Sequence, residues 1–201
     1  MLYHAQGKHS LAEPLYKQAL TIREKVLGRE HLDVAHTLNN LAVLYGDQGK
    51  YYKAEPLFDR VLLLREKLLG SEHPDVAESL NGLGMLYFDQ GRYAKAEPLY
   101  KRALAIREKA LGPSHADVAQ SLNNLAVLYQ VQNRYAEAEP LYKRSVSIQE
   151  KALGPEHPFV ATSLENYAAL LRSTNREDQS AALLARAKTI WTKHSPEQLT
   201  K

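Results

Sequence analysis

Residues 96–104 read AEPLYKRAL, and close copies of this stretch stand at fixed intervals along the chain. The copies read AEPLYKQAL at 12–20, AEPLFDRVL at 54–62 and AEPLYKRSV at 138–146, so that each copy begins 42 residues after the one before it. A glycine and a histidine recur at the same interval: Gly28, Gly70, Gly112 and Gly154, and His31, His73, His115 and His157. Because many positions match in register, the repeat is the strongest structural signal in the sequence.

Each 42-residue unit is predicted to form two helices. Apolar residues in the first helix are spaced by four, three and four positions, as on one face of an α-helix: Val76, Leu80, Leu83 and Tyr87. Residues 90–92 (Gln-Gly-Arg) are expected to end this helix, since glycine readily takes the left-handed conformation at a helix C-terminus. The second helix is predicted to begin near Tyr93 and to stop at Gly112. Pro74 is placed to open the next helix.

The expected fold is all-α, a right-handed solenoid of antiparallel helix pairs, because one pair cannot bury its own apolar face and must stack on its neighbours. The predicted divisions are a partial N-terminal repeat at 1–29, repeats at 30–71, 72–113 and 114–155, and a degenerate C-terminal capping repeat at 156–201. Residues 2–3 and 6–7 align with 44–45 and 48–49. We therefore expect the first repeat to be truncated.

The last unit departs from the pattern of the others. Glu165, Tyr167 and Asn175 replace an asparagine, a leucine and a glycine, and the final helix, predicted over 179–191, lacks the Glu-Pro-Leu-Tyr segment. A terminal repeat needs an atypical outer face because nothing covers it. These changes are typical of a C-terminal cap.

Composition excludes several classes of function. The 201 residues include 26 Lys and Arg against 23 Asp and Glu, a net charge of +3 that is low for a nucleic-acid-binding protein. The absence of cysteine excludes disulfides, thiolate zinc sites and a cysteine nucleophile. No apolar run approaches the roughly 18–20 residues of a membrane span, and no export signal opens the chain. We expect a cytoplasmic protein that binds neither nucleic acid nor membrane.

The units resemble tetratricopeptide repeats. Residues stand where that family places its packing positions: Leu41, Ala42, Tyr45, Gly49, Tyr51, Ala54 and Phe58. The family's usual period is about 34 residues, whereas here the second helix continues through 65–69. This longer form, with LNNLA at 38–42 and the AEPLYKRAL stretch, is similar to the repeats of kinesin light chains and their bacterial look-alikes over nearly the whole chain.

The resemblance implies that the first helices of successive pairs line a concave groove that holds an extended peptide. Groove positions carried over from the family are Asn39, Asn40, Val43, Asn81, Met85, Phe88, Asn123, Asn124, Val127, Asn166 and Arg172. An asparagine offers both an acceptor and a donor, so a column of them can pair with a peptide backbone. The alternative is that these asparagines bridge neighbouring helices and fix the stacking.

Other recurring residues have structural interpretations. The four repeat histidines cannot share a metal ion, because stacked pairs lie about 10 Å apart, so we expect them to cap or dock the turns. Arg23, Arg65 and Arg107, each followed by Glu-Lys, are predicted to lie on a solvated face. A weaker alternative is that basic residues attract an acidic partner: Lys101, Arg102, Lys143 and Arg144. The tyrosines of the AEPLYK stretch are expected to pack in the core: Tyr16, Tyr100 and Tyr142.

No nucleophile–base pair, phosphate loop or carboxylate dyad stands apart from the repeat, so no enzyme, cofactor or metal site is predicted. The leading hypothesis is an adaptor that binds a peptide segment of a partner protein. The competing hypothesis is a spacer or self-association module that pairs, as a homodimer, through its N-terminal end, where Leu11 and Leu15 lack a full covering helix. Catalysis would require a further domain upstream of Met1.

Overall fold

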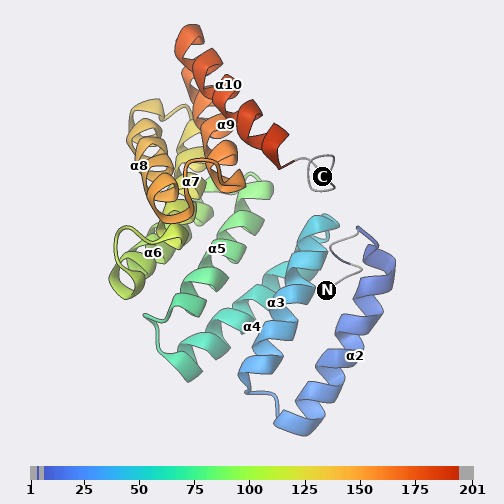
Figure 1. The fold of residues 1–201 in the computed structure, drawn as a ribbon. Helices are drawn as coiled ribbons and strands as arrows, with labels where there is room; N and C mark the ends of the chain where they lie inside the picture. Colours follow the sequence, from blue (N-terminus) through green and yellow to red (C-terminus); the bar gives the residue numbers. More distant parts are fainter. Residues whose placement is uncertain (1–3, 5–6, 195–201) are drawn as a thin grey trace. The chain divides into compact units, whose positions relative to one another are not determined.

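A computed structural model of the chain describes His4 and residues 7–194, and the regular structure of this part is entirely α-helical. The helices are α2 (His9–Leu27), α3 (Leu32–Asp47), α4 (Tyr51–Leu69), α5 (Pro74–Asp89), α6 (Tyr93–Leu111), α7 (Ala116–Val131), α8 (Tyr135–Leu153), α9 (Pro158–Ser173) and α10 (Glu177–Lys193) (Figure 1). The prediction for residues 2–3 and 6 falls outside the described residues. The chain divides into two compact units, residues 1–106 and 107–201, which we describe separately.

A histidine precedes each first helix and caps its N-terminus, as predicted. The Nδ1 atom of His73 accepts a hydrogen bond from the backbone N–H of Asp75 at 3.1 Å, and His31, His115 and His157 bond in the same way at 3.1–3.2 Å. This bond satisfies one of the amides that an α-helix leaves unpaired at its start. Pro74 is the first residue of α5, where its missing N–H costs nothing.

The turns inside the helix pairs end the first helices where the sequence predicted. α5 stops at Asp89, and Gly91 takes a left-handed conformation with φ of 70°. In unit 2 the equivalent residues are Asn133 and Asn175, with φ of 59° and 57°. Asparagine adopts this conformation more readily than other side-chain-bearing residues. The replacement of glycine by Asn175 therefore preserves the turn.

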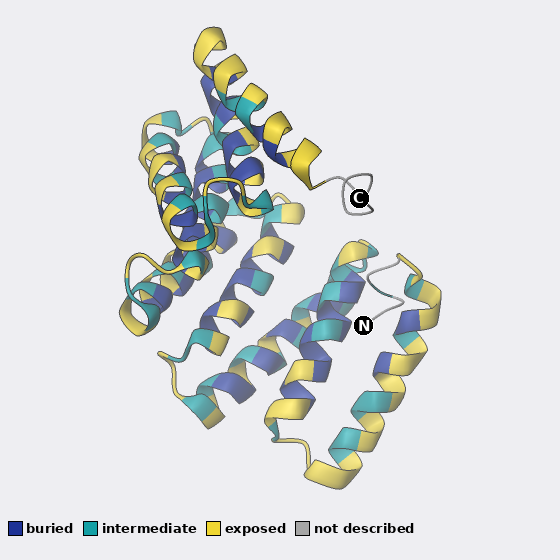
Figure 2. Cartoon of the chain, viewed as in Figure 1, coloured by how far each residue is buried: buried dark blue, intermediate teal, exposed yellow. Residues whose placement is uncertain are grey.

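The core of each unit lies between paired helices. In unit 1, Val34 and Leu38 of α3 pack with Val61 and Leu64 of α4. In unit 2, an equivalent cluster joins α9 to α10: Val160, Ala161, Leu164, Ala187 and Ile190. Tyr16, Tyr100 and Tyr142 are buried, which confirms that they are packing residues. Figure 2 shows the buried stripes along α3 and α9 and the largely exposed outer side of α10.

Ion pairs connect the second helices of successive pairs. In unit 1, Arg60 reaches Glu24 and Arg102 reaches Glu66, each at 2.6 Å. In unit 2, Arg144 pairs with Glu108 at 2.6 Å, and Arg186 pairs with Glu150. Lys101 and Lys143 pair within their own helices, with Glu97 and Glu139. These basic residues are therefore engaged on the second helices, where partly exposed pairs contribute little individually.

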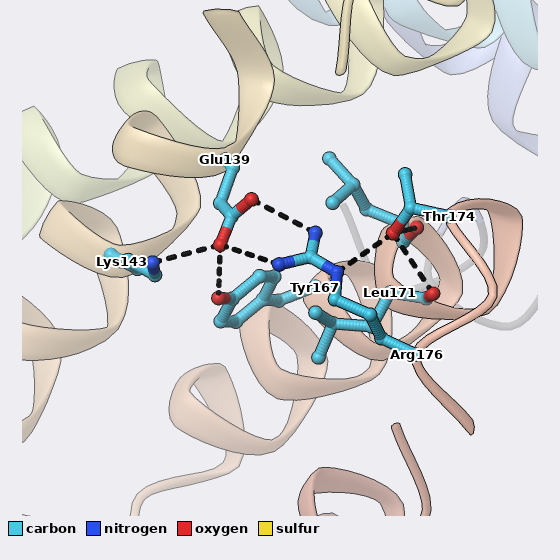
Figure 3. Close-up of polar contacts among 7 residues, drawn as sticks. Glu139, Lys143, Tyr167, Leu171, Thr174 and Arg176 are labelled. Carbon is cyan, nitrogen blue, oxygen red and sulfur yellow. Dashed lines mark hydrogen bonds and ion pairs between the residues drawn. The ribbon is translucent and has the colours of Figure 1, made fainter. Parts of the chain in front are cut away.

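A polar cluster holds the first helix of one pair against the second helix of the pair before it. In unit 1, Glu55 of α4 accepts hydrogen bonds from Tyr87 and Arg92, both at 2.9 Å. In unit 2, Glu139 of α8 accepts from Tyr167 at 3.1 Å and from Arg176 at 2.9 and 2.8 Å (Figure 3).

In the last repeat, the tyrosine of this cluster comes from a different position of the first helix. The position 84 residues after Tyr87 is Leu171, and the tyrosine stands one helical turn earlier, at Tyr167. Its hydroxyl nevertheless reaches the glutamate, and its ring stacks on Tyr142 with centroids 6.0 Å apart. The C-terminal repeat is thus an atypical version of the same unit. Its last helix runs two residues further at each end than the predicted 179–191.

Among the described residues, none of the helices combines the length and the apolar character that crossing a lipid bilayer requires.

Candidate functional site

The first helices of the pairs carry a stripe of side chains that helix packing leaves uncovered. On α3 this stripe consists of His36, Asn40, Val43 and Asp47, which recur at intervals of four, three and four residues and are exposed or half-buried. The other faces of α3 are buried against its neighbours. The same phase is open on α5 in unit 1 and on α7 and α9 in unit 2. We call these stripes the open face of each unit.

In unit 1 the asparagines occupy two adjacent positions of the first helices, and these two positions differ in burial. Asn40 is half-buried on the open face, whereas Asn39 and Asn81 are each only 9% exposed. Gly82 stands at the counterpart of Asn40 in α5, and a Cβ atom there would lie 2.7 Å from Cε1 of Phe58. A side-chain amide cannot occupy that position without moving the buried Phe58 ring. The predicted column of asparagines is therefore interrupted in the second repeat.

The open face of unit 1 also presents apolar residues. Met85 is 49% exposed, and Val43 and Phe88 are half-buried. The ring of Phe88 lies 5.5 Å from that of Tyr93, centroid to centroid. These side chains give this face apolar contact area beside the amide of Asn40.

In unit 2 the predicted residues lie on α7 and α9. Asn123, Asn124 and Val127 are half-buried, and Arg172 is exposed. Asn166 is half-buried and donates a hydrogen bond from Nδ2 to Oδ1 of Asn123 at 3.2 Å. For this pair, the bridging of neighbouring helices is therefore seen directly.

Unit 2 contains a cavity of about 290 Å³ between α7 and α9. Its lining residues are Ala116, Asp117, Gln120, Asn123, Asn124, Gln149, Phe159, Thr162 and Ser163. The rim is exposed at Asp117, Gln120 and Phe159, while Gln149 and Ser163 at the base are buried. Two of the predicted residues, Asn123 and Asn124, thus share a cavity with side chains that were not predicted.

Two of the repeat arginines, Arg65 and Arg107, do not lie on a solvated face, so for them that prediction is wrong, while Arg23 is half-buried. Arg65 and Arg107 are only 5% and 6% exposed. The guanidinium of Arg65 donates from Nη1 to the carbonyl oxygen of Asp75 at 2.8 Å and to Oγ of Ser79 at 2.9 Å. Burial is tolerated because these acceptors at the start of the next helix satisfy the charged donor. The position of Arg65 on α4 places its side chain against the first turns of α5, where these acceptors lie.

Gln149 is the residue of this site that the sequence analysis missed. It occupies the fourth position of the series that begins with Arg23, Arg65 and Arg107. The sequence does contain a signal, because a glutamine replaces the arginine that the three earlier copies share at this position. It was overlooked because the following Glu-Lys is retained, so the segment still matches the repeat.

A second group of side chains, in unit 1, has the composition of a cation site. The ligand-type atoms of His4, His9 and Asp47 lie within 4.8 Å of one another. In the structure, Nε2 of His4 bonds Oδ2 of Asp47 at 2.7 Å. The two histidines lie outside the histidine repeat, which is why the spacing argument did not identify them.

Comparison with known proteins agrees with the helix-pair architecture. The family model described as "Tetratricopeptide repeat" matches residues 1–51, 35–109, 81–151 and 117–193. No match is found among curated proteins.

Solved structures resemble the chain over nearly its full length. The crystal structure of BtubC (BKLC) from P. vanneervenii has 26% sequence identity and a TM-score of 0.81, covering 96% of this chain and 77% of that one. A Podosopora anserina structure with nearly identical TPR-like repeats, named as a kinesin light chain, has 29% identity and a TM-score of 0.75, covering 96% and 92%. The apo form of RapI, at 15% identity and a TM-score of 0.80, covers 96% and 68% and shows the shared fold.

Tetratricopeptide repeats form a noncatalytic scaffold for protein–protein interaction, built as an all-α repeat of the solenoid class. The matched segments together span most of the chain. The chain belongs to the tetratricopeptide repeat family, and its repeats are of the kinesin light chain-like type.

Proposed function

We propose that this chain is an adaptor that binds an extended peptide segment of a partner protein on the open face of its first helices. The observation that carries the proposal is the unit 2 cavity, in which the carboxamides of Gln120, Asn123 and Asn124 line a hollow with an exposed rim. Carboxamides can both donate to and accept from a peptide backbone. In this role the chain would act in the cytoplasm, without a cofactor and without catalysis of its own.

The open face of each unit offers its own kind of contact to a peptide. In unit 2, Asn124 presents an amide beside the bonded Asn123–Asn166 pair, and Arg172 adds a positive charge further along α9. In unit 1, Met85 and Phe88 supply apolar area. Amides that pair with the peptide backbone recognise any sequence, whereas Met85, Phe88 and Arg172 would favour particular side chains.

The proposal can be tested with a library of random 12-residue peptides displayed on phage. We expect the wild-type chain to enrich peptides, and the variant Asn40→Ala/Asn124→Ala to bind those peptides roughly 3- to 10-fold more weakly, the effect of losing one or two net hydrogen bonds. Gln18→Ala/Gln179→Ala, which truncates exposed amides on second helices, is the matched control and should bind as the wild type does. Equal binding by both double variants would refute a role for the open face.

A second candidate function, self-association, is favoured by an apolar stripe on α2. Leu11, Leu15, Ile22 and Val26 are 49–72% exposed and recur on one helical face. One repeat later, the counterparts of Leu15 and Ile22 are Leu57 and Leu64, which pack on α3. The α2 stripe thus has the composition of a packing surface.

Sedimentation equilibrium distinguishes self-association from a monomeric adaptor. A homodimer formed through this stripe should dissociate on dilution, and Leu15→Glu/Ile22→Glu should abolish it while leaving peptide enrichment unchanged. A strict monomer at high concentration would exclude self-association through α2.

A further inference from the structure

We propose that the unit 2 cavity binds an arginine side chain of the partner peptide, with Gln149 at its base. This inference rests on the proposed function, since it names the side chain that the bound peptide would present. It comes from comparing the same position in four successive repeats.

In the three earlier repeats, a guanidinium from the chain itself occupies this position. Arg107 donates from Nη1 to the carbonyl oxygen of Asp117 and to Oγ of Ser121, both at 2.9 Å. Arg65 makes the same two bonds one repeat earlier, and Arg23 makes them at 3.0 Å to the carbonyl of Asp33 and 2.6 Å to the hydroxyl of Thr37. A backbone carbonyl and a hydroxyl four residues later thus form a recurrent guanidinium-binding pair.

The fourth repeat keeps the acceptors and replaces the arginine. The carbonyl of Phe159 and the hydroxyl of Ser163 are the counterparts of the pairs above, and both residues line the cavity. Gln149 is uncharged and shorter than arginine, so it does not fill the space that a guanidinium would take. The cavity lies where the side chain of the other repeats would end.

Among the residues that the structure describes, the side-chain oxygen of Gln149 lacks a hydrogen-bond partner. The residue is only 5% exposed, and within the described part of the chain its Oε1 atom has no hydrogen bond. A buried acceptor without a partner costs free energy, which a donor from outside would recover. Gln149 Oε1, the Phe159 carbonyl and Ser163 Oγ are all acceptors and therefore complement a ligand with several N–H groups.

The rim favours a cation, and arginine over lysine. Asp117 contributes an exposed carboxylate, and the ring of Phe159 is 61% exposed at the edge of the cavity. A planar guanidinium can stack on an aromatic ring while its separate N–H groups reach different acceptors, whereas an ammonium is a single point donor. Arg107 donates a hydrogen bond to Oε1 of Gln120 at 3.2 Å, so this lining amide is already held by the chain itself.

The inference can be tested on the ¹⁵N-labelled full chain by NMR titration with N-acetyl-arginine amide. We expect saturable shifts of the backbone amides of Phe159 and Ser163. N-acetyl-citrulline amide, which has the same shape without the charge, and N-acetyl-lysine amide should bind at least several-fold more weakly. Equal responses to the arginine and citrulline probes, or shifts spread over the whole chain, would overturn the proposal.

Two substitutions at the base of the cavity provide the control for position. Gln149→Arg restores the side chain of the other repeats, so it should fill the cavity and abolish the shifts at Phe159 and Ser163 while raising the melting temperature. Gln149→Met keeps a similar volume and removes the acceptor, so it should weaken binding roughly 3- to 10-fold. Unchanged binding by Gln149→Arg would show that the probe binds elsewhere.

The phage library separates this inference from the proposed function. If both hold, peptides enriched by the wild-type chain carry a recurrent arginine, and Gln149→Arg removes that preference while still enriching peptides. Peptides that depend on Asn40 and Asn124 but show no arginine preference would contradict the arginine site and leave the proposed function standing. No enrichment by the wild-type chain would contradict the proposed function, and the NMR titration then decides the arginine site by itself.

Discussion

Arg176 and Glu139 are joined by two parallel hydrogen bonds, from Nη1 to Oε1 at 2.9 Å and from Nη2 to Oε2 at 2.8 Å (Figure 3). This fork geometry is the strongest arrangement available to an arginine and a carboxylate. The bonds from Arg176, followed by those from Lys143 and Tyr167, lower the pKa of Glu139 to about 2. The glutamate therefore ties the last helix pair to the pair before it as a charged group.

The first prediction concerns the pH dependence of this link. The pKa of Glu139 is lower in the folded chain than its ordinary value of 4.5, so its contribution to stability is fully present above about pH 4.5 and is lost as the pH falls toward 2. We expect Glu139→Gln to melt at a lower temperature than the wild type at pH 7, with the gap closing between pH 4.5 and 2. Thermal melts followed by circular dichroism measure this gap. Glu137→Gln, on the exposed side of α8, should produce a smaller gap, and a gap of constant size for Glu139→Gln would contradict the assignment.

The second prediction uses the displaced tyrosine of the last repeat. Tyr167→Leu removes a hydrogen bond to Glu139 and a ring contact with Tyr142, so it should lower the free energy of unfolding by about 1–2 kcal/mol. Tyr167→Leu/Leu171→Tyr restores the order of leucine and tyrosine found in the earlier repeats, and should recover most of that loss. Urea denaturation of the four members of this double-mutant cycle measures the coupling. Simple additivity of the two substitutions would show that a tyrosine at position 171 cannot replace the one at position 167.

The third prediction compares two glycines inside helices. At Gly82 a Cβ atom would lie 2.7 Å from the buried ring of Phe58, whereas at Gly46 the nearest atom is Cδ1 of Leu86 at an ordinary 3.7 Å. Gly82→Ala should therefore destabilise the chain by about 1–3 kcal/mol through overpacking. Gly46→Ala should stabilise it by up to about 1 kcal/mol through helix propensity. Chemical denaturation of both variants tests the contrast, and the same sign for both would refute it.

The fourth prediction concerns the histidine caps. His73→Ala removes the acceptor for the Asp75 amide and should cost about 1 kcal/mol in the free energy of unfolding. His73→Asn supplies another side-chain acceptor at the same place and should lose much less. Denaturation of the pair, with hydrogen exchange at the first turn of α5, provides the measurement. If the two variants are equally destabilised, the histidine contributes through packing and not through its cap.

The fold was largely predictable from the sequence, because the repeat supplies the same helix signals several times. The break at residues 90–92, the start of α6 at Tyr93 and the opening proline of α5 all agree with the structure. These features depend on local chemistry, namely glycine in a left-handed turn and proline in a first helical turn. Such local signals can be recognised without knowing which residues of a neighbouring helix pack against them.

The site was less predictable, because it depends on which side chain faces which neighbour. Arg65 was expected in solvent and is buried, since its partners at Asp75 and Ser79 come from the next repeat. For Asn123 the sequence left open contact with a ligand or bridging of neighbouring helices, and the residue both lines the unit 2 cavity and bonds to Asn166. Gln149 stands where the earlier repeats carry Arg23, Arg65 and Arg107, and only the hydrogen bonds of those arginines in the structure show what it replaces. The assignment of the open face to peptide binding stays a prediction.

The arginines that bond the start of the next helix also show that one residue decides whether a repeat fills its own guanidinium-binding site or leaves it free. The acceptors at the start of each first helix are made by backbone and by a small hydroxyl side chain, and they persist whether or not the preceding helix provides a guanidinium. Exchanging Arg65 for glutamine would therefore remove the guanidinium that these acceptors bind and leave a binding site open to a guanidinium from another molecule. Such sites could be introduced by substitution in one repeat after another, spaced by 42 residues along the chain. A chain with several of them would select peptides by the spacing of their arginines.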